Sequence, residues 1–372
     1  MSSSLQNHRP LRLGFVGGSL RSAVGYTHFA SSQLDGRWEV VSGCFSTDID
    51  VGVETGRRWG IGPEMISSDW REYLARNVQN LDAVAVLTPT PLHADVCCVA
   101  LDLGIPVICE KAVASTLKQS EQLGRSLKNS DTFFAVTYNY SGYPMVRVLR
   151  EVVRSGQIGA ISHVDIEMPS DAYVKSPAGM PQKWRLKDEE IPTILLDLGV
   201  HVCHLMRFIT GLSANSVNAV MRNYSKFSGL IDDARMWVEY PQVSGSFWLS
   251  KVSLGYRNGL KIRVFGSDGA AFWYQEEPEK LHITREDSSR TVYDRGNTQF
   301  PQEIRERFKP GHPSGFIEAF SNLYTDIAES LMAHKNGESV SKYVEGWQES
   351  HEDLMLLSAA TRSHHEKSWI KI

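Results

Sequence analysis

The first third of the chain alternates short apolar segments with helix-like segments, and this order restricts its fold more than any other feature. Continuous apolar strands that alternate with helices are typical of a parallel sheet covered by helices on both faces. We therefore predict a doubly wound α/β domain over residues 11–137. The apolar segments that we interpret as its strands are Leu11–Val16, Trp38–Phe45, Ala83–Leu87, Pro106–Cys109 and Phe133–Val136.

The first predicted strand continues directly into Gly17, Gly18, Ser19 and Leu20, and a helix-like stretch over Val24–Leu34 follows. Free backbone N–H groups and the dipole at a helix N-terminus favour a bound anion, so this order predicts a cradle for a pyrophosphate. The match to the dinucleotide-binding pattern G-x-G-x-x-G is imperfect because the two glycines are adjacent.

Polar residues follow the other predicted strands at their carboxyl ends, where doubly wound sheets bind ligands. The second strand ends at Ser46 with Asp48 two residues beyond, and no arginine that would favour a 2′-phosphate is adjacent. We therefore predict NAD as the cofactor and leave NADP open. The residues expected to bind it, besides the glycine turn, are Ser46, Thr47, Thr88, Pro89, His93, Glu110, Lys111 and Asn139.

The length of 372 residues exceeds what one hydrophobic core usually supports, so we predict more than one domain. We expect a flexible tail over residues 1–10, the dinucleotide-binding Rossmann domain over 11–137, and an α+β domain over 138–372. The net charge of −4, with lysine and arginine dispersed along the chain, argues against nucleic acid as a partner.

The compartment follows from the cysteines and from the apolar segments. Five cysteines, an odd number without CxxC spacing, predict reduced thiols. The first ten residues lack the apolar core of a signal peptide, and no apolar run reaches membrane-spanning length. We expect a cytoplasmic protein that does not bind membranes.

The stretch Thr193–Phe208, TILLDLGVHVCHLMRF, predicts a helix with two faces. One face is apolar and the other carries Asp197, His201 and His204, spaced four and three residues apart. A carboxylate beside an imidazole can orient the ring and stabilise its cation, as acid–base catalysis requires. The same spacing also permits a metal site, or an ordinary helix with a hydrogen-bonded polar face.

The remaining segments predict a second domain of α+β type. Glu167–Lys187, which carries Trp184 and Arg185, is irregular and is either a binding loop or a surface excursion. From Ser216 onward, alternating segments with glycine turns predict a large, mostly antiparallel open sheet, and residues 286–315 look like a loop. Outward aromatic residues on this sheet suggest contact with another subunit. Two helices, Phe316–Ala333 and Val344–Ser363, end the chain.

The motifs GFVGGS, LTPTPLH, CEK and DLGVH, in this order and spacing, resemble the Gfo/Idh/MocA family of oxidoreductases. The resemblance covers nearly the whole chain, and AVTYNYSGYPMVR and GHPSGFIEAFSNLY are similar to a sugar-dehydrogenase-like branch. It implies a dehydrogenase that oxidises a secondary hydroxyl of a sugar, glycoside or cyclitol to a ketone, or runs the reverse reaction. It also implies a homodimer or homotetramer formed through the antiparallel sheet. The chain departs from the family at Ala112, where proline is usual, and at His204, where Asp or Asn is frequent.

The resemblance also implies roles for individual residues. His201 takes the hydroxyl proton, Lys111 polarises the oxygen, and Asp197 holds a neighbouring hydroxyl. Further substrate contacts are expected from Asn139, Trp184, Arg185 and His312, and no metal is expected. Two alternatives remain open: a redox-neutral enzyme that oxidises a sugar only transiently before elimination or epimerisation, and a non-catalytic sensor of nucleotide or sugar.

Overall fold

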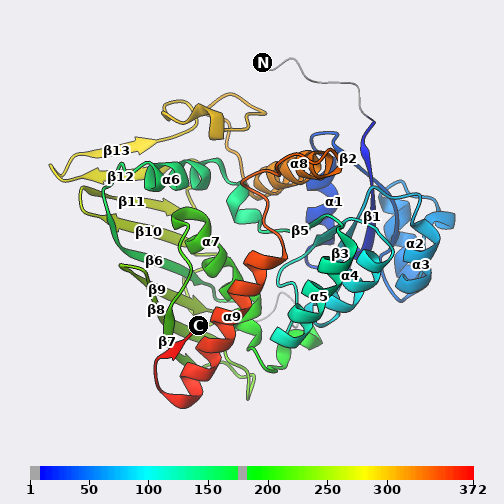
Figure 1. Ribbon diagram of the computed structural model, residues 1–372, viewed down its shortest axis with the longest axis horizontal. Coiled ribbons are helices and arrows are strands. Elements are labelled where there is room, and N and C mark those ends of the chain that lie inside the picture. Colours follow the sequence, from blue (N-terminus) through cyan, green and yellow to red (C-terminus); the bar gives the residue numbers. More distant parts are fainter. Residues whose placement is uncertain (1–8, 175–181) are drawn as a thin grey trace. The chain divides into compact units, whose positions relative to one another are not determined.

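The predicted doubly wound sheet is present as five parallel strands (Figure 1). The structure is a computed structural model that describes residues 9–174 and 182–372. The sheet has the order β2-β1-β3-β4-β5, so all five predicted strands are confirmed, to within one residue at each end. Their bounds are Leu11–Gly17 for β1, Trp38–Cys44 for β2, Ala83–Leu87 for β3, Val107–Cys109 for β4 and Phe134–Val136 for β5.

Five helices connect these strands: α1 (Gly25–Gln33), α2 (Ile49–Arg58), α3 (Trp70–Asn77), α4 (His93–Asp102) and α5 (Leu117–Ser130). Two of them begin at an aspartate that accepts hydrogen bonds from the first turn. Asp48 accepts from the backbone N–H groups at positions 50 and 51, and Asp69 accepts from those at 71 and 72. These carboxylates satisfy donors that the helix itself leaves unpaired, which fixes where α2 and α3 begin.

The helix α8 (Phe316–Lys335) packs on α1 although it lies far along the sequence. The indole Nε1 of Trp38 on β2 donates to the backbone oxygen of Tyr324 at 2.9 Å, and the apolar side of α8 shares one buried core with β1. Residues 316–347 therefore belong to the first structural unit, with Met1–Ala114 and Lys118–Asn139. The expected domain over 138–372 is thus interrupted. Of the expected tail, residues 1–8 lie outside the described residues.

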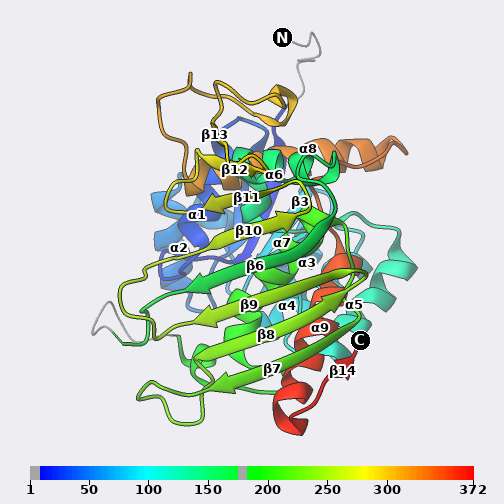
Figure 2. The same ribbon diagram turned by 90° about the vertical axis from the view of Figure 1, so that its left-hand side faces the viewer.

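The second unit is built on nine strands in the order β13-β12-β11-β10-β6-β9-β8-β7-β14 (Figure 2). Neighbouring strands are antiparallel except for β6 and β9, which are parallel, and the predicted open, mostly antiparallel sheet is confirmed. The bounds are Ile161–Pro169 for β6, Ser216–Arg222 for β7, Asp233–Tyr240 for β8, Val243–Ser250 for β9, Lys261–Gly266 for β10, Gly269–Tyr274 for β11, Leu281–Arg285 for β12, Arg290–Tyr293 for β13 and Ile370–Lys371 for β14.

Two short edge strands of this sheet were not predicted. β13 lies within residues 286–315, which the sequence indicated as a loop, and it forms because its backbone pairs with β12. β14 pairs with β7 in the same way. Neither strand has enough alternating apolar residues to be recognised without its partner.

Helices α6 (Pro144–Arg154), α7 (Val200–Thr210) and α9 (Trp347–Glu366) lie on one side of this sheet, and the other side is turned toward the viewer in Figure 2. Side chains along β8 alternate accordingly: Met236 and Val238 are buried, whereas Trp237 is 55% exposed. In the described part of the chain, no helix combines the length and the apolar character needed to cross a membrane.

The predicted helix over Thr193–Phe208 is present, but it is not regular. A π-helical turn, Leu195–Gly199, precedes α7, and Gly211 ends α7 with a φ of 80°. The wider turn contains Asp197 and comes just before His201. Such π-bulges occur frequently at functional sites, where they re-aim side chains relative to a regular helix.

Candidate active site

The glycine turn after β1 has the geometry of an anion cradle. Gly17 has a φ of +85°, and a Cβ built on it would lie 2.6 Å from the backbone oxygen of Leu87. A Cβ on Gly25 would lie 2.0 Å from the oxygen of Gly18. Only glycine fits these positions, so the turn can approach the start of α1 closely. Among the described residues, no side chain caps that helix N-terminus, which leaves its N–H groups available to an anion.

Residues that follow β3 and β5 also leave polar atoms for a ligand. Thr88 Oγ1 and Asn139 Nδ2 are buried, and neither has a hydrogen-bond partner within the described ranges. Buried polar groups are nearly always hydrogen-bonded, so these two atoms are candidate contacts for a bound molecule. Both residues were predicted to bind the cofactor. The cradle and these two atoms fit a dinucleotide.

The end of β2 offers hydroxyl groups rather than a free carboxylate. Ser46 Oγ accepts a hydrogen bond from the Asp48 backbone N–H at 3.1 Å, and the Asp48 carboxylate caps α2. Thr47 is exposed beside them. Ser19 and Leu20, in the glycine turn, lie near α2: the backbone N–H of Leu20 donates to Thr55 Oγ1 at 3.2 Å.

Glu110 lies in a buried polar network after β4. Its Oε1 accepts a hydrogen bond from Thr137 Oγ1 at 2.7 Å and lies 3.4 Å from His28 Nε2. Burial raises the pKa of the Glu110 carboxyl, but the hydrogen bond and charge of His28, the charge of Lys111 and the Thr137 hydrogen bond together bring it below its ordinary value. Glu110 is therefore a buried anion directly before half-buried Lys111. The peptide bond between Lys111 and Ala112 is cis.

His93 opens α4 and lies between two backbone carbonyls. Its Nε2 is 2.7 Å from the oxygen of Thr88, and its Nδ1 is 2.7 Å from the oxygen of Ala112. The preceding Pro89 begins the short 3₁₀ turn over Thr90–Leu92. The ring of His93 thus connects the segments after β3 and β4 rather than pointing into an open cleft.

In the second unit, Asp197 is held by two cations. Its Oδ1 lies 2.6 Å from Arg185 Nη1 and its Oδ2 lies 2.6 Å from Lys251 Nζ. The structure therefore brings together two predicted residues, Asp197 and Arg185. Lys251 was not predicted as a site residue. It is buried, and its ammonium lies 5.0 Å from the centre of the Tyr173 ring. A lysine within the apolar segment Gly245–Val252 was the signal for it, since lysines are rarely buried unless paired.

His201 is buried one turn beyond, with the edge of Tyr140 against its ring at 4.8 Å between ring centres. Burial and the neighbouring charges of Tyr143 and Asp197 raise the pKa of the Tyr140 hydroxyl, so this hydroxyl stays protonated. His204, on the same helix, is fully buried against Phe208, with ring centres 5.5 Å apart.

The two other predicted substrate contacts, Trp184 and His312, make contacts of their own. Trp184 donates through Nε1 to Gln182 Oε1 at 2.9 Å and stacks with the Arg185 guanidinium at 4.5 Å. His312 is exposed, and its backbone oxygen accepts a hydrogen bond from Arg295 at 2.6 Å. Within the described ranges, no three His, Cys, Asp or Glu side chains are arranged to hold a metal ion.

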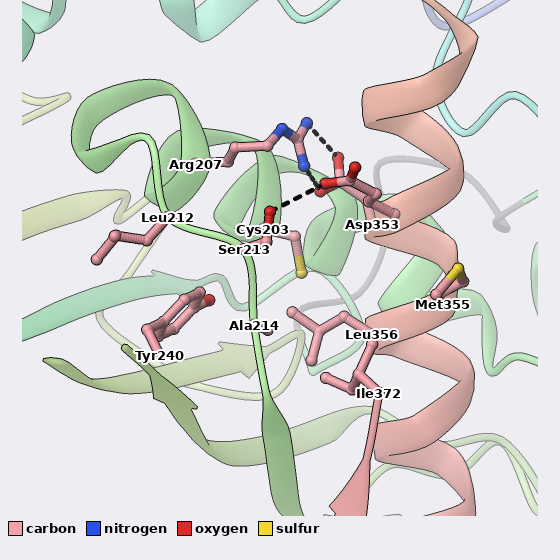
Figure 3. A pocket seen from close by; sticks show the side chains of 11 residues that line it. Cys203, Arg207, Leu212, Ser213, Ala214, Tyr240, Asp353, Met355, Leu356 and Ile372 are labelled. Carbon is pink, nitrogen blue, oxygen red and sulfur yellow. Dashed lines mark hydrogen bonds and ion pairs between the residues drawn. The ribbon is translucent and has the colours of Figure 1, made fainter. Parts of the chain in front are cut away.

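A cavity of about 230 Å³ in the second unit lies between α7, α9 and the end of β8 (Figure 3). It contains none of the predicted site residues. Its polar side chains pair with each other, Arg207 with Asp353 and Ser213 with Glu352, so we assign no ligand to it. Its lining residues include Cys203, Tyr240, Leu356 and Ile372.

Comparison with known proteins identifies both halves of the chain. Residues 11–138 match the family described as an oxidoreductase family with an NAD-binding Rossmann fold, and residues 146–272 match the GFO/IDH/MocA C-terminal domain. An uncharacterised oxidoreductase of Bacillus subtilis, YfiI, is 28% identical over 349 residues, which cover 89% of this chain and 87% of that protein.

Two further relatives are described by their ligands or substrates. The crystal structure of an inositol dehydrogenase homolog from Azotobacter vinelandii in complex with NAD⁺ is 26% identical, with a TM-score of 0.92 and 98% of each chain covered. The same protein has also been solved with NADH and myo-inositol. Levoglucosan dehydrogenase of Pseudarthrobacter phenanthrenivorans is 28% identical over 176 residues, which cover 47% of this chain and 43% of that protein.

Proposed function

The chain belongs to the Gfo/Idh/MocA family of NAD-binding oxidoreductases, and from this membership we propose that it oxidises a secondary hydroxyl of a cyclitol, sugar or glycoside. The observation that carries the substrate class is the full-length match to an inositol dehydrogenase homolog solved with NADH and myo-inositol. The likeness to levoglucosan dehydrogenase, an enzyme named for an anhydrosugar, supports the same class.

The cofactor, when bound, supplies the hydride acceptor. The backbone at Gly17 and Gly18 and the open N-terminus of α1 hold its pyrophosphate, since they present N–H groups to an anion. The bound cofactor would provide hydrogen-bond partners for Thr88 Oγ1 and Asn139 Nδ2, which have none within the described residues. Ser46 and Thr47 offer hydroxyl groups for the adenosine ribose.

His201 accepts the proton of the substrate hydroxyl, because an imidazole is the side chain whose ordinary pKa suits a base near neutral pH. By the family resemblance, Lys111 polarises the oxygen of a substrate hydroxyl and stabilises the negative charge that develops on it. Asp197 is fixed by Arg185 and Lys251. A carboxylate accepts several hydrogen bonds, and the family resemblance assigns Asp197 the role of holding a neighbouring hydroxyl of the substrate.

We also propose an oligomeric state and a cellular location. The protein forms a homodimer or homotetramer through the face of the nine-stranded sheet turned away from its helices, where Trp237 is 55% exposed and His163 lies 6.1 Å from it between ring centres. Light scattering should give a multiple of the chain mass, and Trp237→Glu should reduce it. The location is cytoplasmic, in keeping with five buried free thiols, all within the described ranges.

The test incubates the purified protein with NAD or NADP and a panel of cyclitols, sugars and glycosides. Accumulation of one NADH per ketone formed supports the proposal. Product formed without NADH accumulation indicates the redox-neutral alternative, and nucleotide binding without turnover on any substrate indicates a sensor. Loss of activity with a chelator would contradict the assignment of Asp197 and His201 and support a metal site.

The pH dependence of the same assay tests the base. The rate of oxidation should rise with pH as His201 becomes neutral, because only the neutral ring accepts a proton. His201→Ala should remove this rise while NAD binding, measured by calorimetry, is retained. An unchanged profile in His201→Ala would contradict its role as the base.

A further inference from the structure

His93 makes contacts that a neutral imidazole cannot satisfy. Its two ring nitrogens each lie 2.7 Å from a backbone carbonyl oxygen, one on Thr88 and one on Ala112. A carbonyl oxygen only accepts hydrogen bonds, whereas a neutral ring has one donor and one acceptor nitrogen. In either neutral tautomer, one nitrogen lone pair would face an oxygen lone pair at hydrogen-bond distance, inside a site where the ring is 1% exposed.

We propose that His93 is an imidazolium at neutral pH and that its two hydrogen bonds connect the segment after β3, which carries Thr88, to the segment after β4, which carries Lys111. The ring is thus a positioning residue for the cofactor site and not a direct ligand of the nucleotide. The inference rests on the proposed roles of Thr88 and Lys111, but the protonation state of His93 is a property of the protein alone.

The surroundings of the ring agree with a buried cation. The titratable group beside it is the Cys109 thiol on β4, with Cys97 of α4 beyond, while the Glu110 carboxylate turns to Thr137 and His28. Burial lowers the pKa of His93, but Cys109 and the two carbonyls raise it to about 9. Burial also raises the pKa of the Cys109 thiol well above its usual value, so the thiol is uncharged near neutral pH. The hydrogen bonds to the two carbonyl oxygens are therefore the reason that the ring is charged.

The position of the His93 ring allows its charge to restrain the backbone near Lys111 and at Thr88. Ala112 stands directly after Lys111, so the bond to its oxygen restrains the backbone that carries the lysine. The bond to Thr88 restrains the residue whose hydroxyl lacks a partner among the described residues. Because two charge-assisted hydrogen bonds hold both segments, loss of the proton should loosen the lysine and the threonine together.

The pH dependence has a definite sign. The pKa of His93 is higher in the folded protein than the ordinary value of 6.5. The contribution of the ring to stability and to NAD affinity is therefore complete below that value and is lost as the pH rises through about 9. A neutral, merely structural histidine would give no change in this range.

The direct test is nitrogen NMR of the protein labelled with ¹⁵N-histidine, without any nucleotide. The His93 signals are identified as those missing from His93→Gln. Both ring nitrogens should be protonated at pH 7.5 and should titrate only near pH 9. A neutral tautomer at pH 7.5 overturns the proposal, whether or not the proposed enzymatic function holds.

The second test is NAD affinity, measured by calorimetry between pH 7 and pH 10. We expect His93→Gln to bind NAD about tenfold more weakly at pH 7.5 and to lose the decline above pH 9. His93→Lys, which keeps a charge and several donors, should recover affinity and move the decline to higher pH, since an ordinary lysine titrates near 10.4. Equal affinity and equal pH dependence in His93→Gln would overturn the proposal.

Two controls separate this effect from others. Val96→Ala removes buried volume from the same helix without removing a hydrogen-bonding group, and it should leave the pH dependence unchanged. The same series in a Lys111→Met background shows whether the effect depends on the charge of the lysine itself. Where His93→Gln does not fold, the signals missing from His93→Lys identify the ring, and the NMR titration of the unsubstituted protein still decides the question.

Discussion

The two units of this protein assemble their functional residues in different ways. In the first unit, each predicted site residue follows its own strand within a few positions: Gly17 ends β1, Thr88 follows β3, and Lys111 follows β4. In the second unit, Asp197 receives Arg185 from an irregular segment and Lys251 from the end of β9, 54 residues further along. One site is arranged by a sheet edge and the other by long-range ion pairs.

This difference shows what each kind of site depends on. Parallel strands bring their carboxyl ends to one edge, so a residue type at the end of a strand already defines its place. A charged cluster whose members come from a π-turn, a 3₁₀ turn and the end of a strand follows no such rule, and its members are held by their ion pairs. Substitutions in the first unit should therefore change chemistry more than stability, whereas those in the second should change both.

The largest effect is expected at Lys111. Lys111→Met keeps the approximate volume and removes the charge, so turnover should fall about 10³-fold while NAD binding and thermal stability are retained. Steady-state rates and calorimetry measure the two effects separately. Near-normal turnover would show that the strand-edge position of this lysine is not used in catalysis, and a loss of fold would erase the contrast between the units.

The next effect is expected at Lys251. Lys251→Met removes one of the two cations beside Asp197, and breaking a buried ion pair is costly. Because the carboxylate keeps its contact with Arg185 and is partly exposed, we expect a loss of about 2 kcal/mol of folding free energy together with weaker substrate binding. The matched control is Lys261→Met. This lysine also lies 5.0 Å from a tyrosine ring, that of Tyr256, but it is only partly buried.

Denaturant unfolding and the KM for substrate measure this pair of variants. If Lys251→Met is as stable as Lys261→Met, the carboxylate is not held by the buried lysine. If stability falls while KM and kcat are unchanged, the ion pair supports the fold and not the site.

How much the sequence predicts follows the same division. The parallel strands were predicted because they are continuous apolar runs bounded by turns. Gly17, Thr88 and Asn139 were predicted as cofactor-binding residues because they stand at strand ends. The domain boundary could not be predicted: the apolar face of α8 would fit any core, and its contacts with Trp38 and His28 in the structure show where it packs.

In the second unit, the sequence predicted the helix that carries Asp197 and His201 but not its π-turn, since local spacing does not distinguish a widened turn from a regular one. Lys251 was included in a predicted strand, and only its partner explains why a charged residue is buried there. The roles of the predicted substrate residues stay predictions until the variants above are measured.

A smaller, pH-dependent effect is expected from Glu110. Its pKa lies below the ordinary value of 4.5, so its contribution to stability is present above that value and is lost as the pH falls below it. Glu110→Gln should cost about 1.5 kcal/mol at pH 7, because a hydrogen-bonded charge is lost. The difference in stability between the two proteins should shrink toward pH 3 in unfolding experiments. A difference that is constant with pH would mean that the carboxyl is not charged in the folded protein.

The smallest effect, and the sharpest test of the division into units, concerns Tyr324. Its hydroxyl lies 2.7 Å from Nδ1 of His28, which is fully buried on α1, so Tyr324→Phe deprives a buried nitrogen of its partner at a cost of about 1 kcal/mol. The control is Tyr26→Phe, since Tyr26 also lies on α1 but is 66% exposed and should change stability by less than about 0.5 kcal/mol. Hydrogen exchange should show reduced protection in α1 and α8 together, because the lost bond joins these two helices. If protection falls only in α8, the bond to His28 does not hold this helix in place. The contacts from Tyr324 through His28 to Glu110 would then not connect α8 to the segment that carries Lys111.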